Sequence, residues 1–259
     1  MKKILIAVAA LPFVFWFLWM AFPATTIQSI VEDSAGDGKI TIEVQRLKKG
    51  FFYTLHIDKV AIKSSGEELV SFSNIHGRIN PFGLIRMRLD ASITGTIGTG
   101  TISGSAVLAK NSVQAKLDCR DFDIQEMPFL KYAGIRGAGT ISGRFLVADD
   151  KGRVEFVTKN AAFEPADFSG IKVPMNFFSE VTGSLSIERN AIEVVSVSLE
   201  GKDIYARLKG VIRNGAADLA MELMPSGPFL ENPLFLLEAG RYRVSPGYYV
   251  VPIRGAFSP

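Results

Sequence analysis

A long uncharged apolar run at the amino end is the feature that most limits what this chain can fold into. Residues 4–22 contain no charged side chain, and Lys2 and Lys3 precede them. A helix of that length crosses a hydrocarbon core of roughly 30 Å. Because positive charge stays on the cytoplasmic side, the two lysines favour a cytoplasmic amino terminus. We therefore expect the rest of the chain to work on the far side of a membrane.

Two interpretations of this run compete, an uncleaved anchor and a cleaved signal peptide. A signal peptide has an apolar core of about 7–15 residues, followed by small residues at the cleavage site. This run is longer, and the segment from Trp19 to Ala24 contains no small-x-small site. We therefore predict a transmembrane anchor over 1–24, a linker over 25–38 and a β-rich domain over 39–259. The predicted anchor side chains include Ile4, Phe13, Trp16, Trp19 and Phe22.

The charge and cysteine content of the exported part argue against several classes of protein. After residue 24 the chain holds 27 basic and 26 acidic side chains, because the anchor carries two of the 29 basic residues and none of the 26 acidic ones. This near-balance provides no electrostatic footprint for nucleic acid. Cys119 is the single cysteine, so no internal disulfide can form. We expect it to fill a small apolar space in the core.

Alternation of apolar and polar residues runs through most of the exported part. It is clear at 40–45, 53–58, 181–188 and 217–223. A period of two is typical of strands with one dry and one wet face. Short turn signals separate the runs, and Asn214-Gly215 suits a two-residue type I′ turn. The pattern predicts a mainly β fold, a curved and largely antiparallel meandering sheet that forms either a groove or a sandwich-like closure.

Three short apolar segments interrupt the strand pattern. They lie at 80–86, 123–132 and 228–239. Each is predicted to form one or two helical turns that leave the sheet and return to it. Covering the core is the more ordinary use of such apolar segments, so we do not assign a site to them.

An internal repeat links two of the predicted strands. Residues 98–108 read Gly-Thr-Gly-Thr-Ile-Ser-Gly-Ser-Ala-Val-Leu and return at 137–147 as Gly-Ala-Gly-Thr-Ile-Ser-Gly-Arg-Phe-Leu-Val. Glycines on one face of a strand indicate a bend or a close backbone approach. The spacing matches neither G-x-G-x-x-G nor G-x-x-x-x-G-K-[ST], and the glycines lie within a strand pattern. Nucleotide binding is therefore not expected.

Few residue patterns in this chain carry chemistry. His56 and Asp58 share one predicted strand face, but nothing marks a nucleophile near them, so we expect an exposed pair. The motifs H-E-x-x-H, C-x-x-C and G-x-S-x-G are absent. We therefore predict that the protein is not an enzyme, and we assign no catalytic, cofactor-binding or metal-binding residue.

Taken together, four sequence features resemble the bacterial type II secretion system protein N family, which is itself similar to the AsmA-like, repeating β-groove proteins of the Gram-negative envelope. The features are the lysine-flanked apolar run, the strand pair over 40–63 followed by 69–74 and 80–84, the Gly-Thr-Ile-Ser-Gly repeat, and the terminal segment 251–259. The resemblance implies a single-pass inner-membrane protein with a periplasmic β domain that serves the secretion apparatus. It transfers no site residue to this chain.

Two functions remain open at this point. In the first, the domain is a scaffold that docks other inner-membrane or periplasmic secretion proteins through strand edges or through residues 228–239. In the second, the sheet is a groove whose dry face binds phospholipid acyl chains. The groove lining would then include Leu185, Ile187, Leu219, Met221 and Leu223.

Overall fold

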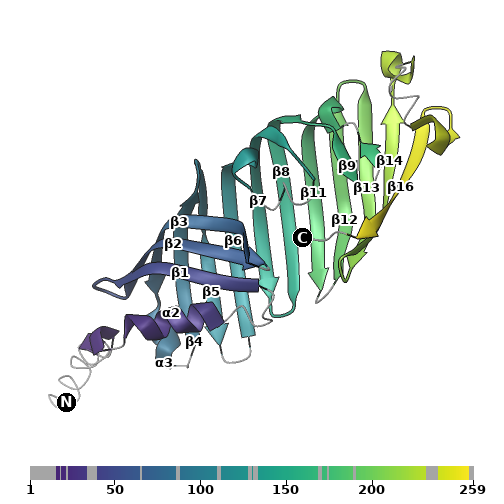
Figure 1. Cartoon of the computed structure of the whole chain (residues 1–259). Helices are drawn as coiled ribbons and strands as arrows, with labels where there is room; N and C mark the ends of the chain where they lie inside the picture. The colour runs from purple at the N-terminus through teal and green to yellow at the C-terminus, as the bar shows by residue number, and fades with distance from the viewer. Residues whose placement is uncertain are drawn as a thin grey trace, which may run out of the picture. The chain divides into compact units, whose positions relative to one another are not determined.

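The structure is a computed structural model whose described part is dominated by β-strands. It describes residues 16–17, 19–21, 23–33, 40–64, 66–85, 88–109, 112–127, 130, 134–168, 171–173, 175–188, 191–231 and 239–256. Strands make up 72% of the structure, and fourteen of them form one large antiparallel sheet (Figure 1). The predicted mainly β class, with a large antiparallel sheet and a few short helices, is confirmed.

Sequence neighbours are also sheet neighbours over most of the chain, as expected for a meander. The order in the large sheet is β1-β2-β3-β4-β5-β6-β7-β8-β11-β12-β13-β14-β16-β15, and β10 and β9 form a separate two-stranded sheet. By its contacts the chain divides into two compact units. Unit 1 comprises Met1–Ile97 and Ile102–Val113, and unit 2 comprises Gly98–Thr101 and Gln114–Pro259.

Unit 1 contains helices α2 and α3 and most of the first five strands. Its elements are α2 (Ala24–Asp33), β1 (Ile40–Lys49), β2 (Thr54–Ser64), β3 (Glu67–Ile79), α3 (Pro81–Ile85), β4 (Arg88–Ile97) and β5 (Gly100–Ala109). Its buried cluster joins the amino-terminal segment to the strands, with Trp19, Ile27, Leu55 and Ile79 in contact. Residues 24–33, most of which we assigned to a linker, are therefore helical because the helix buries Ile27 against the sheet.

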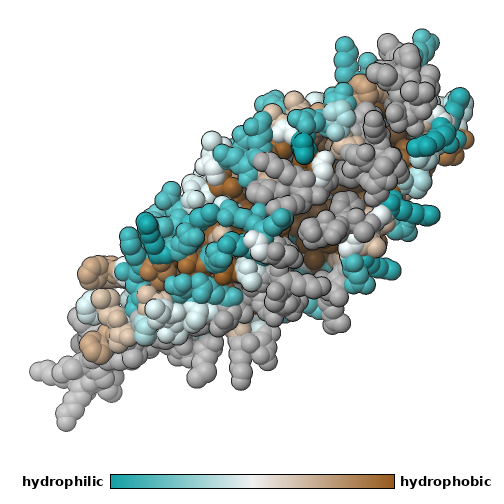
Figure 2. All heavy atoms as spheres, viewed as in Figure 1, coloured by the Kyte–Doolittle hydropathy of each residue, from teal (hydrophilic) through white to brown (hydrophobic). Residues whose placement is uncertain are grey.

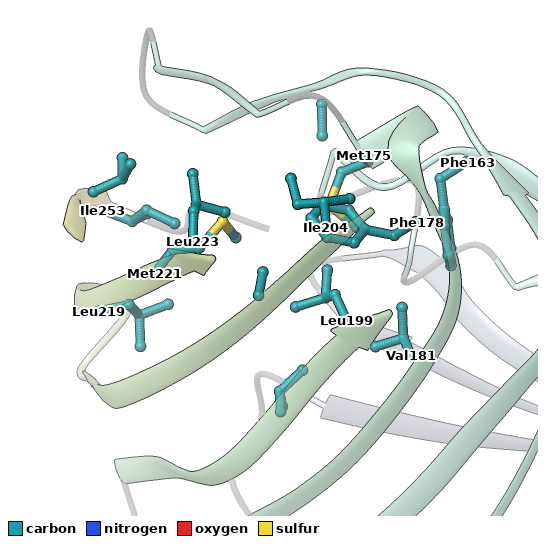
Figure 3. Close-up of a cluster of buried hydrophobic side chains, with 14 of the residues drawn as sticks. Phe163, Met175, Phe178, Val181, Leu199, Ile204, Leu219, Met221, Leu223 and Ile253 are labelled. Atoms are coloured by element: carbon teal, nitrogen blue, oxygen red, sulfur yellow. The ribbon is translucent and has the colours of Figure 1, made fainter. Parts of the chain in front are cut away.

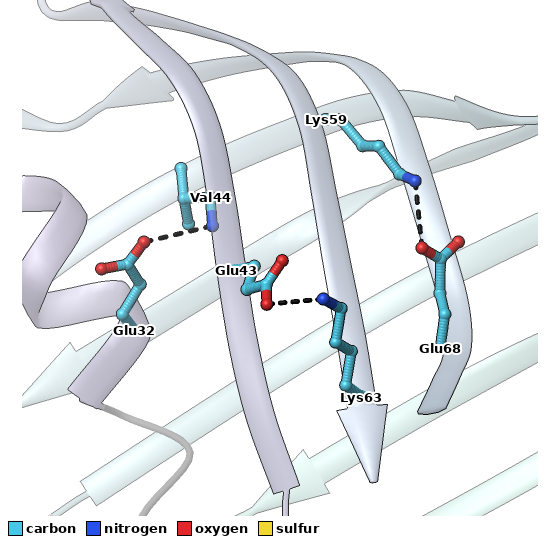
Figure 4. A network of polar contacts seen from close by, with 6 residues as sticks. All are labelled: Glu32, Glu43, Val44, Lys59, Lys63 and Glu68. Atoms are coloured by element: carbon cyan, nitrogen blue, oxygen red, sulfur yellow. Dashed lines mark hydrogen bonds and ion pairs between the residues drawn. The ribbon is translucent and has the colours of Figure 1, made fainter. Parts of the chain in front are cut away.

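Helix α2 also covers the edge of the sheet. The backbone N–H of Val44 donates to Glu32 Oε1 at 3.2 Å (Figure 4). Gln28 Nε2 donates to the Val44 carbonyl at 3.1 Å. Strand β1 stands at one end of the sheet order, and none of the described strands pairs with its outer side. Side chains from a helix that take up such groups block edge-to-edge pairing with another chain.

Two of the five predicted anchor residues lie in the described part of unit 1. Trp19 is buried, whereas Trp16 is exposed. Ile4, Phe13 and Phe22 lie outside the described residues. Within the described ranges, no helix reaches the length and apolarity needed to span a bilayer.

Unit 2 holds the remaining strands and the short 3-10 helices. Its elements are β6 (Ser112–Asp123), η1 (Ile124–Glu126), β7 (Gly137–Ala148), β8 (Lys151–Phe163), β9 (Ala166–Phe168), β10 (Ile171–Val173), η2 (Met175–Phe177), β11 (Phe178–Glu188), β12 (Ala191–Gly201), β13 (Ile204–Arg213), β14 (Ala216–Pro225), η3 (Gly227–Glu231), η4 (Gly240–Tyr242), β15 (Arg243–Ser245) and β16 (Tyr248–Ala256). One buried cluster extends from β8 to β16 and forms the core of this unit.

Local sequence signals account for several of these elements. Asn214 and Gly215 both have positive φ and join β13 to β14, as the predicted type I′ turn requires. The segment 123–132 begins with η1, where Asp123 accepts a hydrogen bond from the Gln125 backbone N–H at 2.8 Å. The segments 80–86 and 228–239 contain α3 and η3, although 232–238 lie outside the described residues.

The two repeat copies form strands β5 and β7. In the second copy, Gly139 has a φ of 116° and stands where the register between β7 and β8 shifts. A side chain added there would come within 2.8 Å of the Ala161 backbone. The predicted close backbone approach is therefore confirmed at this glycine, which occupies a β-bulge.

Candidate functional site

Unit 2 presents one sheet face whose cross-strand rows are apolar over eight strands. Residues directly opposite one another on neighbouring antiparallel strands point to the same face. Row 1 is Cys119, Gly143, Phe156, Gly183, Val197, Leu208, Met221 and Val251. Row 2 is Leu117, Phe145, Val154, Leu185, Val194, Gly210, Leu219 and Ile253. Row 3 is Ala115, Val147, Gly152, Ile187, Ile192, Ile212, Ala217 and Gly255.

Burial changes along these rows. At β14 and β16 the side chains are buried, and Figure 3 shows Leu219, Met221, Leu223 and Ile253 gathered over one side of the strands. At β7 and β8 they are only partly covered: Phe145, Val154 and Phe156 are half-buried, and Val147 is exposed. We call the part of the face on β6, β7, β8 and β11 the half-open part.

The five residues predicted to line a groove all lie on this face. Leu185 and Leu219 belong to row 2, Ile187 to row 3 and Met221 to row 1. Leu223 lies one step beyond Met221 along β14, opposite Ala206 and Tyr249. Leu219, Met221 and Leu223 are buried in the core cluster, whereas Leu185 and Ile187 are half-buried at the half-open part.

Phe156 crosses the half-open part because the neighbouring strand has a glycine opposite it. A Cβ atom built on Gly183 would lie 2.3 Å from Phe156 Cζ. Any larger residue at position 183 would therefore displace the ring. An aromatic ring laid over a strand glycine also pins the register of the two strands.

The one cysteine is a core residue of this face. Cys119 is buried, and burial raises the pKa of its thiol to about 12, with the negative charge of Asp118 acting in the same direction. A thiol that stays protonated at neutral pH is a poor nucleophile and a poor metal ligand. Its role is therefore the apolar packing that the sequence predicted.

The opposite face of unit 2 is polar and carries a shallow hollow of about 590 Å³. Five hydroxyl side chains line it: Ser142, Thr182, Ser184, Ser196 and Ser198. At its rim Arg144 Nε donates to Asp118 Oδ1 at 2.9 Å, and this hydrogen bond lowers the pKa of the Asp118 carboxyl. Sequence analysis did not predict the hollow, although the alternation over 181–188 had assigned Thr182 and Ser184 to a wet strand face.

The two histidines meet on unit 1. His56 and His76 stand opposite each other on β2 and β3, with ring centroids 4.5 Å apart. His56 Nε2 lies 3.1 Å from Asp58 Oδ1, and Asp58 in turn lies 3.5 Å from Arg46. Sequence spacing indicated the His56–Asp58 pair but not the second histidine, which arrives through strand pairing. Among the described residues, no group of three potential ligands is arranged to bind a metal ion.

Comparisons with known proteins provide no basis for a functional assignment, which therefore rests on the residues of this chain. No family model, curated protein or solved structure matches the chain. The resemblance to secretion and β-groove proteins therefore stays a prediction from sequence features. The apolar face of unit 2 is the candidate functional site that the geometry provides.

Proposed function

We propose that this protein is a membrane-anchored, non-enzymatic envelope protein whose apolar sheet face binds acyl chains. The observation that carries the proposal is the set of three apolar rows, uninterrupted by a polar side chain over eight strands. A strand face of this kind is stable only when protein, a partner or lipid covers it. At the half-open part, a bound ligand would cover the apolar side chains.

The dimensions of the half-open part suit one acyl chain. Neighbouring strands lie about 4.8 Å apart, so the step from β6 to β11 through β7 and β8 covers roughly 14 Å. One leaflet of a bilayer has a hydrocarbon thickness of roughly 15 Å. Phe145, Val154 and Leu185 would contact the chain along row 2. Leu219, Met221 and Leu223 would form the closed end of the groove.

Two further observations support an anchored groove over a closed sheet. Among the described strands, β1 and β15 stand at opposite ends of the sheet order and do not pair with each other, which supports an open sheet. The uncharged run over 4–22 would attach the chain to a membrane, which is a source of lipid. We place the domain in the periplasm on the inner membrane, in agreement with the family that the sequence resembles.

Site-specific photo-crosslinking in membranes tests the proposal. p-Benzoylphenylalanine is placed at Val154 on the apolar face of the full-length chain, and at Glu155 as the matched control. The two positions are adjacent in β8 and point to opposite faces, so the pair compares the two faces at one level of the same strand. After illumination, mass spectrometry measures phospholipid attached to each variant. We expect lipid adducts at position 154 and few at position 155.

The result that would overturn the proposal is equally direct. Absence of lipid adducts at position 154, with a second probe at Phe145 also negative, would mean that the half-open part does not contact acyl chains. Equal yields at positions 154 and 155 would indicate random contact with surrounding lipid. Either outcome refutes a groove on this face.

A scaffold for type II secretion proteins is the second candidate, and one observation favours it. Strand β15 pairs with β16 only through Arg243 and Ser245, opposite Tyr249 and Tyr248. Among the described strands, none pairs with 250–256 on that side of β16. Such an edge is a template for a strand from a partner protein. Affinity capture of the crosslinked full chain should then enrich secretion-system inner-membrane proteins, and no enrichment over an unrelated anchored protein would eliminate this candidate.

A further inference from the structure

Large apolar side chains are exposed together at one end of unit 1. We call this set the aromatic patch. Its members are Trp16, Phe17, Met20, Phe51, Phe52 and Phe82. Phe51, Phe52 and Phe82 are 65%, 72% and 71% exposed, far beyond what a water-facing turn requires. In Figure 2, brown and tan side chains gather at the lower left, over the turn between β1 and β2 and the helical residues before it.

Hydrogen bonds join the segments that carry the aromatic patch. Trp19 Nε1 donates to the Gly50 carbonyl at 3.1 Å, and the Trp19 and Tyr53 rings lie 5.6 Å apart. The Ile79 backbone N–H donates to the Tyr53 carbonyl at 2.8 Å, which brings the start of α3 beside the same turn. Strands β1 and β3 both pair antiparallel with β2, so both end at this end of the sheet.

These contacts constrain how an anchor can be placed. Residues 4–15 alone would span only about 18 Å as a helix, well short of a hydrocarbon core of roughly 30 Å. The run reaches a sufficient length only if its last residues up to Phe22 are also at membrane depth. Trp19 lies three residues before Phe22, about 4.5 Å along a helix. Because the side chain of Trp19 is hydrogen-bonded to the carbonyl of Gly50, the turn between β1 and β2 must lie at the membrane boundary as well.

We propose that this end of unit 1 is seated in the membrane interface, with the aromatic patch among the lipid headgroups and the first acyl carbons. The inference rests on the proposed anchor. Aromatic rings are favoured at that depth because one side of the layer is apolar and the other is wet. Lys48 is exposed beside the patch, and Lys49 Nζ donates to the Trp19 and Met20 carbonyls. Basic side chains at this level attract anionic headgroups.

Depth-dependent fluorescence quenching tests the inference on the full-length chain. The protein is reconstituted into vesicles of phosphatidylcholine and phosphatidylglycerol, in a Cys119→Ala background. An environment-sensitive fluorophore is attached at Phe52→Cys, at Phe82→Cys and at the control Val195→Cys, whose native residue is 47% exposed on β12. Lipids with a spin label near the headgroup serve as quenchers. Flotation of each sample reports whether the chain is anchored at all.

The possible outcomes distinguish a failure of the proposed anchor from a failure of the proposed interfacial placement of the aromatic patch. We expect flotation of every variant, several-fold stronger quenching at positions 52 and 82 than at 195, and a blue-shifted emission at the first two. Flotation with unquenched labels at 52 and 82, or with equal quenching at 195, overturns the interfacial placement and leaves the anchor intact. Failure to float overturns the anchor and with it this inference.

Discussion

Replacing Leu223 with alanine tests how completely the apolar face of unit 2 is closed at β14. Leu223 is 3% exposed and stands between Ala206 and Tyr249 in adjacent strands. The substitution removes three carbon atoms, worth about 2.4 kcal/mol at 0.8 kcal/mol for each buried methylene. The cavity left behind adds to this loss. We therefore expect the free energy of unfolding of unit 2 to fall by about 3–5 kcal/mol.

Leu185→Ala is the matched substitution on the same face. Leu185 is half-buried in row 2, where the face is half-open. Because the side chain is half-buried, its removal loses only about half of the free energy of transferring a leucine side chain from water to the core. A site open to solvent or ligand also leaves no sealed cavity. We expect a loss of about 1 kcal/mol. The exposed Val195 provides a reference, because Val195→Ala should change stability by less than about 0.5 kcal/mol.

Urea unfolding of the full-length protein in detergent, followed by far-ultraviolet circular dichroism, measures these differences. The chain has two compact units, so each variant is compared through the transition that shifts in Leu223→Ala, without a two-state fit to the whole curve. A loss at Leu185 as large as at Leu223 would mean that protein seals the face at both ends. That result would refute the half-open part and the acyl-chain groove built on it.

Three further predictions concern single contacts. Gly183→Val should lower the free energy of unfolding by about 1–3 kcal/mol in thermal or urea melts, because the added Cβ meets the ring opposite it at 2.3 Å. Cys119 should resist iodoacetamide at pH 8 in the folded chain and react roughly a thousandfold faster in urea, since folding raises its pKa from 9.0 to about 12. Glu32→Ala should cost about 1 kcal/mol and speed hydrogen exchange at the Val44 amide, which would lose its acceptor.

Each of these contacts has its own control. Gly240 has no atom within 4 Å of an added Cβ, so Gly240→Ala should leave the melt unchanged, and equal losses at 183 and 240 would contradict the clash. Fast alkylation of folded Cys119 would contradict the protonated, buried thiol. Glu43→Ala removes only an exposed ion pair with Lys63, which is drawn beside Glu32 in Figure 4. It should not change exchange at Val44.

Local patterns were sufficient to predict the strands and several of the turns. Alternation assigned Leu219, Met221 and Leu223 to one face, and that face proved to be the buried one. The same alternation could not tell them from Leu185 and Ile187, which are half-buried on the same face. How deeply a side chain is buried depends on which other segments pack over its strand, and the residues of the strand itself do not specify those segments.

Three features came only from contacts between distant segments. The helix at 24–33 lies where we predicted mostly linker, because its stability depends on packing against β1. Trp19 was predicted only as an anchor residue, yet its Nε1 donates a hydrogen bond to the carbonyl of Gly50, 31 positions later. His56 and His76 meet only because β2 and β3 pair in that register.

The sequence by itself determined the mainly β character of the chain: an uncharged apolar run, a nearly charge-balanced remainder and a series of two-faced strands all follow from the period and chemistry of neighbouring residues. Tertiary structure alone decided that apolar positions from eight strands align into continuous rows, and that aromatic side chains gather around the turn at Gly50. Both depend on hydrogen-bond register between strands, and register is a relation between residues that only folding brings together.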